Sequence, residues 1–338
     1  MNITFLKDNV LIEQKVALFL QEWDNNQDFF NAKTSGSTGK PKNVTIKKEH
    51  AIQSCKNTAA KLNLLKKENA LLCLDLDTIG GKMMLIRSII LNLNLFVTEP
   101  SANPLLDCTE KIDFIALVPL QLQAVLNEDS PRIRAIKNVI IGGGVISNSL
   151  QKQLKNEKIT VFQTYGMTET ISHIALRKLG EETEECFETL STIEISSEED
   201  RLKINAPLIG VHNLLTNDMV EIKDSKHFKW IGRADFVVNS GGVKLHPEQL
   251  TQKLEGKIPE SFFISGTPDE KLGQKLIIVI QSEVQEKYCF KKFYSSLGKY
   301  EIPKEAWFIS NFSFTASAKI NQSETLKQTD VAGIREVL

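Results

Sequence analysis

The sequence predicts an α/β protein with two domains, and three observations support this prediction. The chain has 338 residues, which is long enough for two domains. Between residues 33 and 165, short apolar runs alternate with amphipathic stretches, a pattern typical of a largely parallel sheet with helices. From residue 189 the pattern becomes short and strand-like, and a second unit starts after residue 232. We therefore expect a large N-terminal domain, residues 1–231, and a small C-terminal domain, residues 232–338.

The N-terminal domain is expected to hold a mostly parallel sheet between helices. Its buried strands are predicted from short apolar runs, namely Leu71–Leu74, Leu95–Val97, Phe114–Val118, Val139–Ile141 and Thr160–Phe162. Amphipathic stretches between these runs predict helices at Gly81–Leu91, Leu120–Leu126 and Ser147–Leu154. Strand and helix alternate along the chain, which favours parallel pairing.

Two further regions complete the predicted fold. A β-rich subdomain is expected from the strand-like runs Ser191–Ile195, Leu202–Ile204 and Val220–Ile222. In the C-terminal domain, Pro247 opens a helix directly after His246, because proline suits an early helical position. A strand at Leu276–Ile280 and a helix at Lys287–Leu297 follow. The class is therefore α/β, or α+β when the β-rich subdomain and the C-terminal domain are included.

Charge and cysteine content argue against several classes of protein. Lys and Arg number 41 against 42 Asp and Glu, a formal net charge of −1, whereas nucleic-acid-binding proteins usually carry a basic excess. The five cysteines form no Cys-x-x-Cys pair, which argues against a zinc site or disulfide framework and favours a reduced cytoplasm. The longest apolar region, Met83 to Val97, is interrupted by Arg87, Asn92 and Asn94, so no membrane span is expected.

Residues 34–42 have the sequence TSGSTGKPK and contain more hydrogen-bond donors than a solvated turn needs. The phosphate-binding loop G-x-x-x-x-G-K-[ST] places a magnesium-binding hydroxyl after its lysine. Here Pro41 follows Lys40, and proline also prevents a helix from starting there. We therefore expect a phosphate site with a different loop geometry, formed by Thr34, Ser35, Gly36, Ser37, Thr38, Gly39 and Lys40.

Four more segments contain residues suited to nucleotide chemistry. The glycine run after a predicted strand leaves open backbone against which a flat ring could lie, and a later segment offers an aromatic face, a hydroxyl and a carboxylate. The third combines an Asn-Asp pair with a Gly-Arg-Ala-Asp segment at the change of pattern, and the fourth is a Ser-Ala-Lys segment near the C-terminus. In order, the four are Gly142, Gly143 and Gly144; Tyr165, Gly166, Thr168 and Glu169; Asn217 and Asp218 with Arg233 and Asp235; and Ser317 to Lys319.

In this order, the segments resemble the motifs of the adenylate-forming superfamily of acyl-CoA synthetases, luciferases and adenylation domains. The resemblance extends over about residues 33–322. It implies ATP and Mg²⁺ as requirements, coenzyme A as the usual thiol co-substrate, and a small C-terminal domain that rotates about a hinge. The hinge residue of the family pattern is Asp235 here. A carboxylate would attack the α-phosphate to give an acyl-adenylate, and a thiol would then displace AMP.

The roles that the residue types suggest agree with those that the resemblance implies. The loop at residues 34–40 would bind the β- and γ-phosphates and the departing pyrophosphate. Tyr165 and the glycine run would hold adenine, Asp218 would accept the ribose hydroxyls, and Arg233 would donate to ribose or the α-phosphate. Thr168 would donate to the α-phosphate and Glu169 would be an oxygen ligand of Mg²⁺. Lys319 would neutralise charge as the acid attacks, so it is expected to be catalytic together with Thr168 and Glu169.

The short chain and the segment Val238 to Glu248, VNSGGVKLHPE, resemble the o-succinylbenzoate–CoA ligases of menaquinone biosynthesis. An aromatic dicarboxylate needs a cation for the carboxylate that does not react, and Lys82 is the candidate, followed by Arg87. The loop begins at Thr34, so we expect much of the family's usual N-terminal subdomain to be absent or shrunken. Ala318 stands where the family usually has glycine, and no histidine stands near Gly80 where the family has one.

Each motif also has a structural alternative. The loop could be a plain Ser/Gly turn, Asp218 could hold a turn with Asn217, Lys319 could be a surface lysine, and Lys82 a solvated lysine at a helix start. His173 and His246 are interpreted as structural residues. At the level of function, the alternatives are another carboxylic acid, adenylation for a carrier protein, and an inactive nucleotide-binding protein. A P-loop NTPase is disfavoured by Pro41, and a homo-oligomer is left open.

Overall fold

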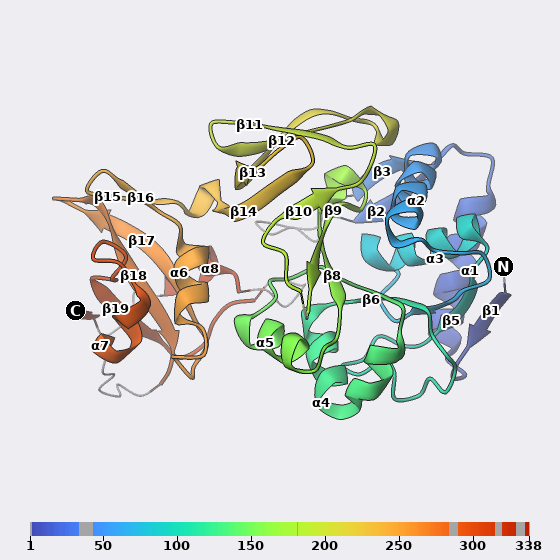
Figure 1. The fold of residues 1–338 in the computed structure, drawn as a ribbon, viewed down its shortest axis with the longest axis horizontal. Coiled ribbons are helices and arrows are strands. Elements are labelled where there is room, and N and C mark those ends of the chain that lie inside the picture. The colour runs from blue at the N-terminus through green and yellow to red at the C-terminus, as the bar shows by residue number, and fades with distance from the viewer. Residues whose placement is uncertain are drawn as a thin grey trace.

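The chain is described by a computed structural model, which covers residues 2–33, 43–180, 182–283, 290–314, 320–328 and 335–337. Figure 1 shows a large N-terminal part with the smaller C-terminal part to one side. One twelve-stranded sheet runs through the larger part, and a six-stranded sheet lies in the smaller part. The predicted α/β class is confirmed. The domain boundary placed at residue 232 stays a prediction.

One half of the large sheet is parallel throughout. In spatial order its strands are β1 (Asn2–Phe5), β5 (Asn94–Val97), β4 (Asn69–Leu72), β6 (Phe114–Leu117), β7 (Asn138–Ile141) and β8 (Val161–Gly166). The helices of this half are α1 (Val10–Asp24), α2 (Lys48–Leu62), α3 (Ile79–Leu91), α4 (Pro119–Ala135) and α5 (Asn148–Asn156). The strands and helices predicted here are present, with ends shifted by a few residues, and α4 is much longer than predicted.

Successive side chains of the parallel strands enter two different hydrophobic cores. On β4, Leu72 belongs to one core together with Phe19 of α1 and Met83 of α3. Its neighbour Leu71 belongs to the other core, together with Leu122 of α4. Both faces of the sheet are therefore buried, because consecutive side chains of a strand point to opposite faces. This double burial explains why these strands appear in the sequence as short, continuous apolar runs.

The other half of the large sheet is antiparallel. In spatial order it contains β9 (His173–Leu179), β10 (Phe187–Thr189), β14 (His227–Arg233), β13 (Val211–Ile222), β12 (Arg201–Ala206) and β11 (Glu194–Glu198). The predicted runs at 202–204 and 220–222 lie within β12 and β13. The strand predicted at Ser191–Ile195 is wrong at its start, because the N–H of Ile193 donates to the carbonyl of Leu190 in a turn at 3.0 Å.

A two-stranded hairpin forms a third, separate sheet. It consists of β2 (Phe29–Lys33) and β3 (Asn43–Lys47), which pair antiparallel. Short 3₁₀ helices lie at Thr168–Thr170, Pro207–Ile209 and Ala234–Phe236. Across the described ranges, no helix is both long and apolar enough to cross a bilayer.

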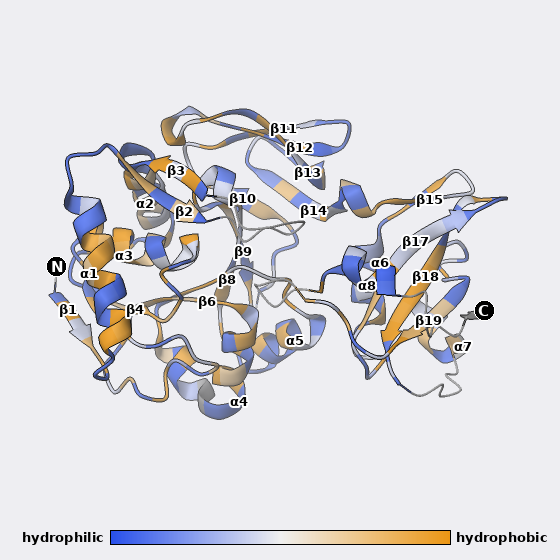
Figure 2. Ribbon diagram, turned by 180° about the vertical axis from the view of Figure 1, so that it is seen from behind, coloured by the Kyte–Doolittle hydropathy of each residue, from blue (hydrophilic) through white to orange (hydrophobic). Residues whose placement is uncertain are grey.

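The C-terminal part has its own sheet and its own cores. Its strands are β15 (Val238–Ser240), β16 (Val243–Leu245), β17 (Phe262–Asp269), β18 (Gly273–Gln281), β19 (Glu305–Ile309) and β20 (Arg335–Val337), and its helices are α6 (Pro247–Leu254), α7 (Phe290–Phe293) and α8 (Gln322–Lys327). Strand β18 is hydrophobic along much of its length (Figure 2), because Ile277 and Ile278 point into cores on opposite faces. The predicted helix at 287–297 is shorter: α7 is followed by a 3₁₀ turn at Tyr294–Ser296, and residues 284–289 lie outside the described ranges.

Candidate active site

The residues that flank the predicted phosphate loop are neighbours on one hairpin. Lys33 is the last residue of β2, Asn43 is the first residue of β3, and the two are paired across the hairpin. The loop itself, with the predicted nucleotide-binding residues Thr34 to Lys40, lies outside the described residues. The predicted catalytic Lys319 also lies outside them. Their roles stay predictions.

The glycine run follows β7 at the carboxyl edge of the parallel half. Gly142 lies against β8, since a Cβ on it would come within 2.5 Å of Oγ1 of Thr164. The Thr164 hydroxyl donates to the carbonyl of Ile141 at 3.1 Å and joins the two strand ends. Gly143 has φ +79°, a conformation that glycine adopts without strain. The run therefore leaves backbone accessible beside the end of β8, at the sheet edge where α/β proteins bind ligands.

The segment with Thr168 and Glu169 lies on a strained turn after β8. Glu169 is exposed, and Thr168 is half-buried. Ile171 has φ 66° and ψ −50°, and the N–H of Ser172 donates to the carbonyl of Thr170 at 2.7 Å. This is a γ-turn of the strained type, and a β-branched residue with positive φ is an outlier. Such strain costs roughly 1–3 kcal/mol and is found most often at functional sites.

Tyr165 and Asp218 form the best-defined pair of the predicted nucleotide site. The Tyr165 hydroxyl donates to Oδ2 of Asp218 at 2.6 Å, and the indole N–H of Trp230 donates to Oδ1 at 3.1 Å. Tyr165 and Asp218 are 9% and 6% exposed. Burial and the neighbouring Asp218 carboxylate hold the pKa of Tyr165 well above its usual range, so the phenol keeps its proton and donates.

This pair requires the antiparallel half of the sheet to curl. Strands β8 and β13 are separated by β9, β10 and β14, which across a flat sheet would amount to about 19 Å at about 4.8 Å per strand. A hydrogen bond between their side chains is possible only because the strands bend around a shared interior. Tyr165 lies in that interior, with its ring centroid 5.1 Å from that of Phe228 and 5.8 Å from that of Phe187.

Arg233 lies opposite Asp218 on the neighbouring strand. The two residues are paired in the register of β13 and β14, and Nη1 of Arg233 is 3.9 Å from Oδ1 of Asp218. Nη2 of Arg233 donates to Oδ2 of Asp235 at 2.9 Å, and the Asn217 amide donates to the same oxygen at 3.3 Å. The predicted hinge residue Asp235 is therefore held by two donors from the predicted nucleotide site.

Helix α6 of the C-terminal part contacts the N-terminal part at both of its ends. Near its start, Oε1 of Glu248 accepts from the backbone N–H of Arg233 at 2.9 Å. Burial raises the pKa of Glu248, and its Oε2 is buried with no hydrogen-bond partner among the described residues. At the other end, Asn148 of α5 donates from its backbone N–H to Glu255 at 2.8 Å and from its side chain to the carbonyl of Gln252 at 2.7 Å.

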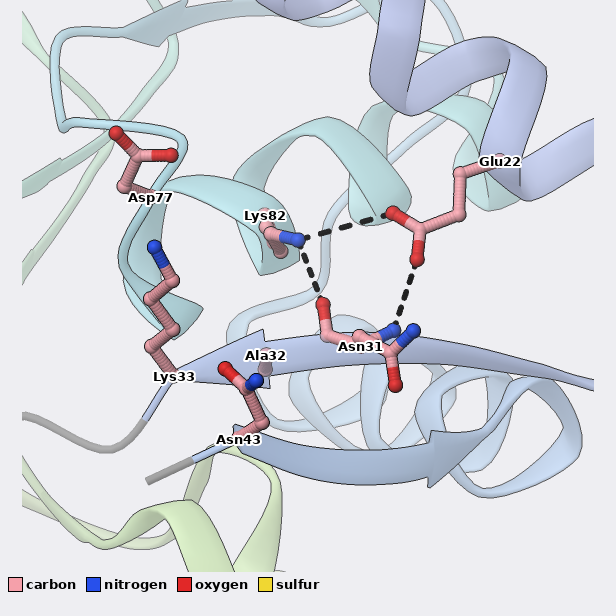
Figure 3. A pocket seen from close by; sticks show the side chains of 7 residues that line it. All are labelled: Glu22, Asn31, Ala32, Lys33, Asn43, Asp77 and Lys82. Atoms are coloured by element: carbon pink, nitrogen blue, oxygen red, sulfur yellow. Dashed lines mark hydrogen bonds and ion pairs between the residues drawn. The ribbon is translucent and has the colours of Figure 1, made fainter. Parts of the chain in front are cut away.

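Lys82 lines a small polar pocket beside the hairpin (Figure 3). The pocket has a volume of about 120 Å³ and is lined by Glu22, Asn31, Ala32, Lys33, Asn43, Asp77 and Lys82. The Lys82 ammonium donates to the carbonyl of Asn31 at 2.6 Å and lies 3.8 Å from Glu22. It also lies 5.0 Å from the ring centroid of Phe19. Its charge thus already has partners in the protein.

Arg87 lies on the buried side of the same helix. It is 2% exposed, and its Nη2 donates to Oγ of Ser172 at 2.7 Å. Its Nε is buried and has no hydrogen-bond partner in the part of the chain that the structure describes. Lys82 and Arg87, the two predicted substrate cations, therefore differ in that the first has an acidic neighbour and the second has a free buried donor.

A magnesium site in this region would depend on the nucleotide. Within the described ranges, no three or more His, Cys, Asp or Glu side chains are grouped so that they could hold a metal ion. Mg²⁺ commonly binds to one or two carboxylates, substrate phosphates and waters, and such a site needs no protein cage. The exposed Glu169 fits that kind of ligand set, so its predicted role stays a prediction.

Comparison with known proteins identifies the family. The family of AMP-binding enzymes matches residues 29–204, which is more than half of the chain. The chain belongs to this family. The resemblance inferred from the order of the sequence motifs is thereby confirmed.

Within this family, the chain is similar to three named proteins. An acyl-CoA synthetase (AMP-forming)/AMP-acid ligase II-like protein from Dyadobacter fermentans is 36% identical, over 94% of both chains, with a TM-score of 0.63. A 2-succinylbenzoate–CoA ligase from Listeria monocytogenes is 26% identical over 90% of this chain and 71% of its own length. An o-succinylbenzoate coenzyme A synthetase from Bacillus subtilis, solved with ATP and a magnesium ion, shares the fold with a TM-score of 0.76, at 22% identity over 88% of this chain and 69% of that one.

Sequence reasoning missed several residues of the site. Trp230 stands two positions before the Gly-Arg pair, but its contact with Asp218 arises from the curl of the sheet. Ser172 and His173 follow the Thr168–Glu169 segment after two residues, and the contact of Ser172 with Arg87 joins two distant parts of the chain. Glu248 follows a helix-opening proline, but a carboxylate in a first helical turn is common, so its position alone did not indicate a site residue.

Proposed function

We propose that the chain is an AMP-forming acid–thiol ligase that converts o-succinylbenzoate to its coenzyme A thioester, a step of menaquinone biosynthesis. Membership of the AMP-binding enzyme family supports the chemistry. The name of the Listeria monocytogenes relative supports the choice of acid. The observation that carries the proposal is the meeting of Tyr165 of β8 with Asp218 and Arg233 of the paired strands β13 and β14, which lie about 50 residues further along the chain.

The adenosine of ATP would lie at the carboxyl edge of β7 and β8. Gly142–Gly144 and the Tyr165–Gly166 segment flank this edge and would hold adenine. Asp218 would accept the ribose hydroxyls. An ionised carboxylate accepts about four hydrogen bonds, and Tyr165 and Trp230 use two of these positions. Two acceptor positions thus remain, one for each ribose hydroxyl.

The protein would catalyse adenylation mainly by positioning and by neutralising charge. An oxygen of the acid attacks the α-phosphorus and pyrophosphate leaves, with Thr34–Lys40 binding the phosphates and Thr168 donating to the α-phosphate. Lys319 would offset the negative charge of the attacking and attacked groups. Glu169 would hold a Mg²⁺ ion that supplies further positive charge at the phosphates. In the second half, the thiolate sulfur of coenzyme A attacks the acyl carbon and AMP leaves.

The second carboxylate of o-succinylbenzoate needs a positively charged partner. Lys82 and Arg87 are the two candidates, and their contacts favour Arg87. Lys82 is already held by Asn31 and lies near Glu22. The Nε of Arg87 is a buried donor without a partner among the residues that the structure describes, and leaving such a group unpaired is unfavourable. A Lys82→Ala enzyme that kept its apparent affinity for o-succinylbenzoate would remove Lys82 from the acid site.

Between the two half-reactions, the C-terminal part would rotate about Asp235. The contacts of Asp235 with Arg233 and Asn217 link this residue to the nucleotide site. Release of the nucleotide or of pyrophosphate would therefore change the surroundings of the hinge. Rotations of this kind commonly expose a different face of the mobile domain to the same substrate.

The experiment is a substrate panel with the purified chain. It is incubated with ATP, Mg²⁺, coenzyme A and one acid at a time, and pyrophosphate release and the mass of the thioester are measured. We expect the o-succinylbenzoyl thioester and AMP. Faster reaction with benzoates or fatty acids would overturn the choice of acid. Background ATP–pyrophosphate exchange with every acid would overturn the ligase assignment and favour a nucleotide-binding protein without catalysis.

A further inference from the structure

Arg87 presents a buried charge without a countercharge among the described residues. It is 2% exposed on α3, and its Nε has no hydrogen-bond partner in the described ranges. The titratable group that affects it most is Cys55, a buried residue of α2. Burial raises the pKa of Cys55 to about 12, so this thiol is neutral near pH 7 and does not balance the guanidinium. A buried guanidinium needs an anion or a full set of acceptors.

Donor and acceptor can be assigned for each hydrogen bond in the chain that leads from Thr58 to Arg87. The Thr58 hydroxyl lies 3.1 Å from the carbonyl of Ser54, and a carbonyl can only accept. The Thr58 hydroxyl therefore gives its proton to Ser54. It must accept from Nε2 of His173, which lies 3.0 Å away.

This assignment sets the tautomer of His173. Burial and the nearby Arg87 hold the pKa of His173 well below its usual range, so the imidazole is neutral. With its proton on Nε2, its Nδ1 is an acceptor. The Oγ of Ser172 lies 3.4 Å from this Nδ1, at the long end of hydrogen-bond distances. Ser172 thus directs its proton to His173 and turns a lone pair to Nη2 of Arg87.

The backbone around Ser172 leaves little room for movement. The hydroxyl of Thr170 donates to the carbonyl of Ser172 at 2.8 Å, and Ile171 between them is in the strained γ-turn. On the facing strand, a Cβ at Gly166 would overlap the Ser172 carbonyl and His173. Ser172 is therefore packed tightly onto the turn that also holds Thr168 and Glu169.

We propose that Ser172 and His173 are positioning residues that orient Arg87 to receive the second carboxylate of a dicarboxylic acid. Thr58 anchors the histidine from α2, His173 orients the serine hydroxyl, and the serine hydroxyl occupies Nη2 of Arg87. The free Nε is then left for the substrate. The same turn connects Ser172 to Thr168 and Glu169, so recognition of the acid and adenylation share one rigid segment. This inference rests on the proposed function, because it requires an acid with a second carboxylate.

The test compares two acids that differ in the second carboxylate alone. They are o-succinylbenzoate and 4-oxo-4-phenylbutanoate, the same acid without the ring carboxylate. The preference is the ratio of the two kcat/KM values, measured by pyrophosphate release. We expect Ser172→Ala to lower this preference about tenfold or more, as for a lost hydrogen bond to a charged group. The loss should come from a higher KM for o-succinylbenzoate, with the KM for ATP unchanged.

Two further variants make the test independent of folding. Ser172→Thr keeps the hydroxyl and should restore most of the preference. Ser88→Ala is the matched control, since Ser88 is a fully buried serine of α3 whose hydroxyl bonds the carbonyl of Met84 and not Arg87. It should leave the preference unchanged even if it lowers stability.

The outcomes separate this inference from the proposed function. A wild-type chain that makes no adenylate from o-succinylbenzoate overturns the proposed function, and this inference with it. A wild-type chain that prefers o-succinylbenzoate, together with a Ser172→Ala variant of equal preference, overturns this inference alone. A Ser172→Thr variant with the same loss as Ser172→Ala also contradicts it, because the hydroxyl would then not matter.

Discussion

The hydroxyl of Tyr165 donates a hydrogen bond to Oδ2 of Asp218 at 2.6 Å and so joins β8 of the parallel half to β13 of the antiparallel half. Both residues are largely buried. The bond therefore has two consequences, one for the stability of the curled sheet and one for the orientation of the carboxylate predicted to bind ribose. Substitutions of Tyr165 and of Trp230, the two donors to Asp218, test both consequences.

Tyr165→Phe removes the phenolic donor and keeps the ring in its aromatic cluster. A buried carboxylate oxygen then loses its partner, which costs about 1–3 kcal/mol. We expect a lower midpoint of urea unfolding and a higher KM for ATP, with a smaller effect on the KM for the acid. Tyr294→Phe is the control, because the buried Tyr294 hydroxyl has no partner among the described residues. If both variants lost equal stability, the Tyr165–Asp218 bond would not be the cause.

Trp230→Phe removes the second donor to Asp218 and preserves a large apolar side chain. Because Trp230 acts on Asp218 through one hydrogen bond of 3.1 Å, we expect weaker binding of AMP and ATP, by about tenfold or more. Indole fluorescence provides a readout besides activity, since AMP bound next to Trp230 should change its emission. Trp307→Phe is the control, because the Trp307 indole bonds Glu305 in the C-terminal part. An AMP-dependent fluorescence change that survives Trp230→Phe would contradict the role given to Trp230.

Asn148→Ala removes the side-chain hydrogen bond from α5 to the carbonyl of Gln252 and keeps the backbone N–H that donates to Glu255. The domain orientation described here should then be less populated, so the segment after Arg233 should be cut faster in limited proteolysis. The ratio of the two half-reaction rates should also change. Gln153→Ala on the same helix is the matched control, since Gln153 bonds residues of the N-terminal part. Equal proteolysis rates for the two variants would show that Asn148 does not hold the domain orientation.

Glu248→Gln tests the pH dependence of the contact between α6 and Arg233. Burial raises the pKa of Glu248 in the folded chain, so the folded state holds its proton more tightly than the unfolded state does. Stability from this group is present below the ordinary pKa of about 4.5 and falls as pH rises through the raised value. Glutamine does not titrate, and its Oε1 still accepts from Arg233. The variant should therefore gain stability relative to wild type between pH 4 and pH 7.

A second glutamate should show the opposite sign. Burial raises the pKa of Glu301, but Lys253 and the N–H of Gly298 outweigh burial and lower the pKa overall. Glu301→Gln should therefore lose stability relative to wild type as pH rises from 3 to 6, because the stability that ionised Glu301 contributes is fully present above its ordinary pKa of 4.5. Thermal unfolding midpoints of both variants across these ranges would check the pair. A shift of the same sign in both would contradict the environments described for these two carboxylates.

The strands of the parallel half could be predicted because each is buried on both faces. Leu71 and Leu72 enter opposite cores, and this arrangement needs a continuous apolar run that is visible in the sequence. The antiparallel strands have one face toward solvent and more polar residues, so most of them gave a weaker signal. The turn at Leu190–Ile193 contains buried apolar residues, and for that reason it was predicted as part of a strand.

The motif residues of the site could be predicted, but most of their partners could not. Tyr165, Asp218 and Arg233 stand in segments whose order along the chain resembles a family. Trp230 and Ser172 became visible when the curl of the sheet and the turn at Ile171 placed them beside Asp218 and Arg87. Contacts of this kind depend on three-dimensional curvature, which a period of apolar residues along the chain does not encode.

The pairing of Lys33 with Asn43 has a consequence for engineering. The residues on either side of 34–42, Lys33 and Asn43, are neighbours on a hairpin that forms its own two-stranded sheet. A replacement segment from another AMP-binding enzyme would join the same two residues, and a change in its length would add little closure entropy. Chimaeras made at this position should keep the scaffold intact, so the phosphate-binding role predicted for residues 34–40 could be tested separately from acid preference.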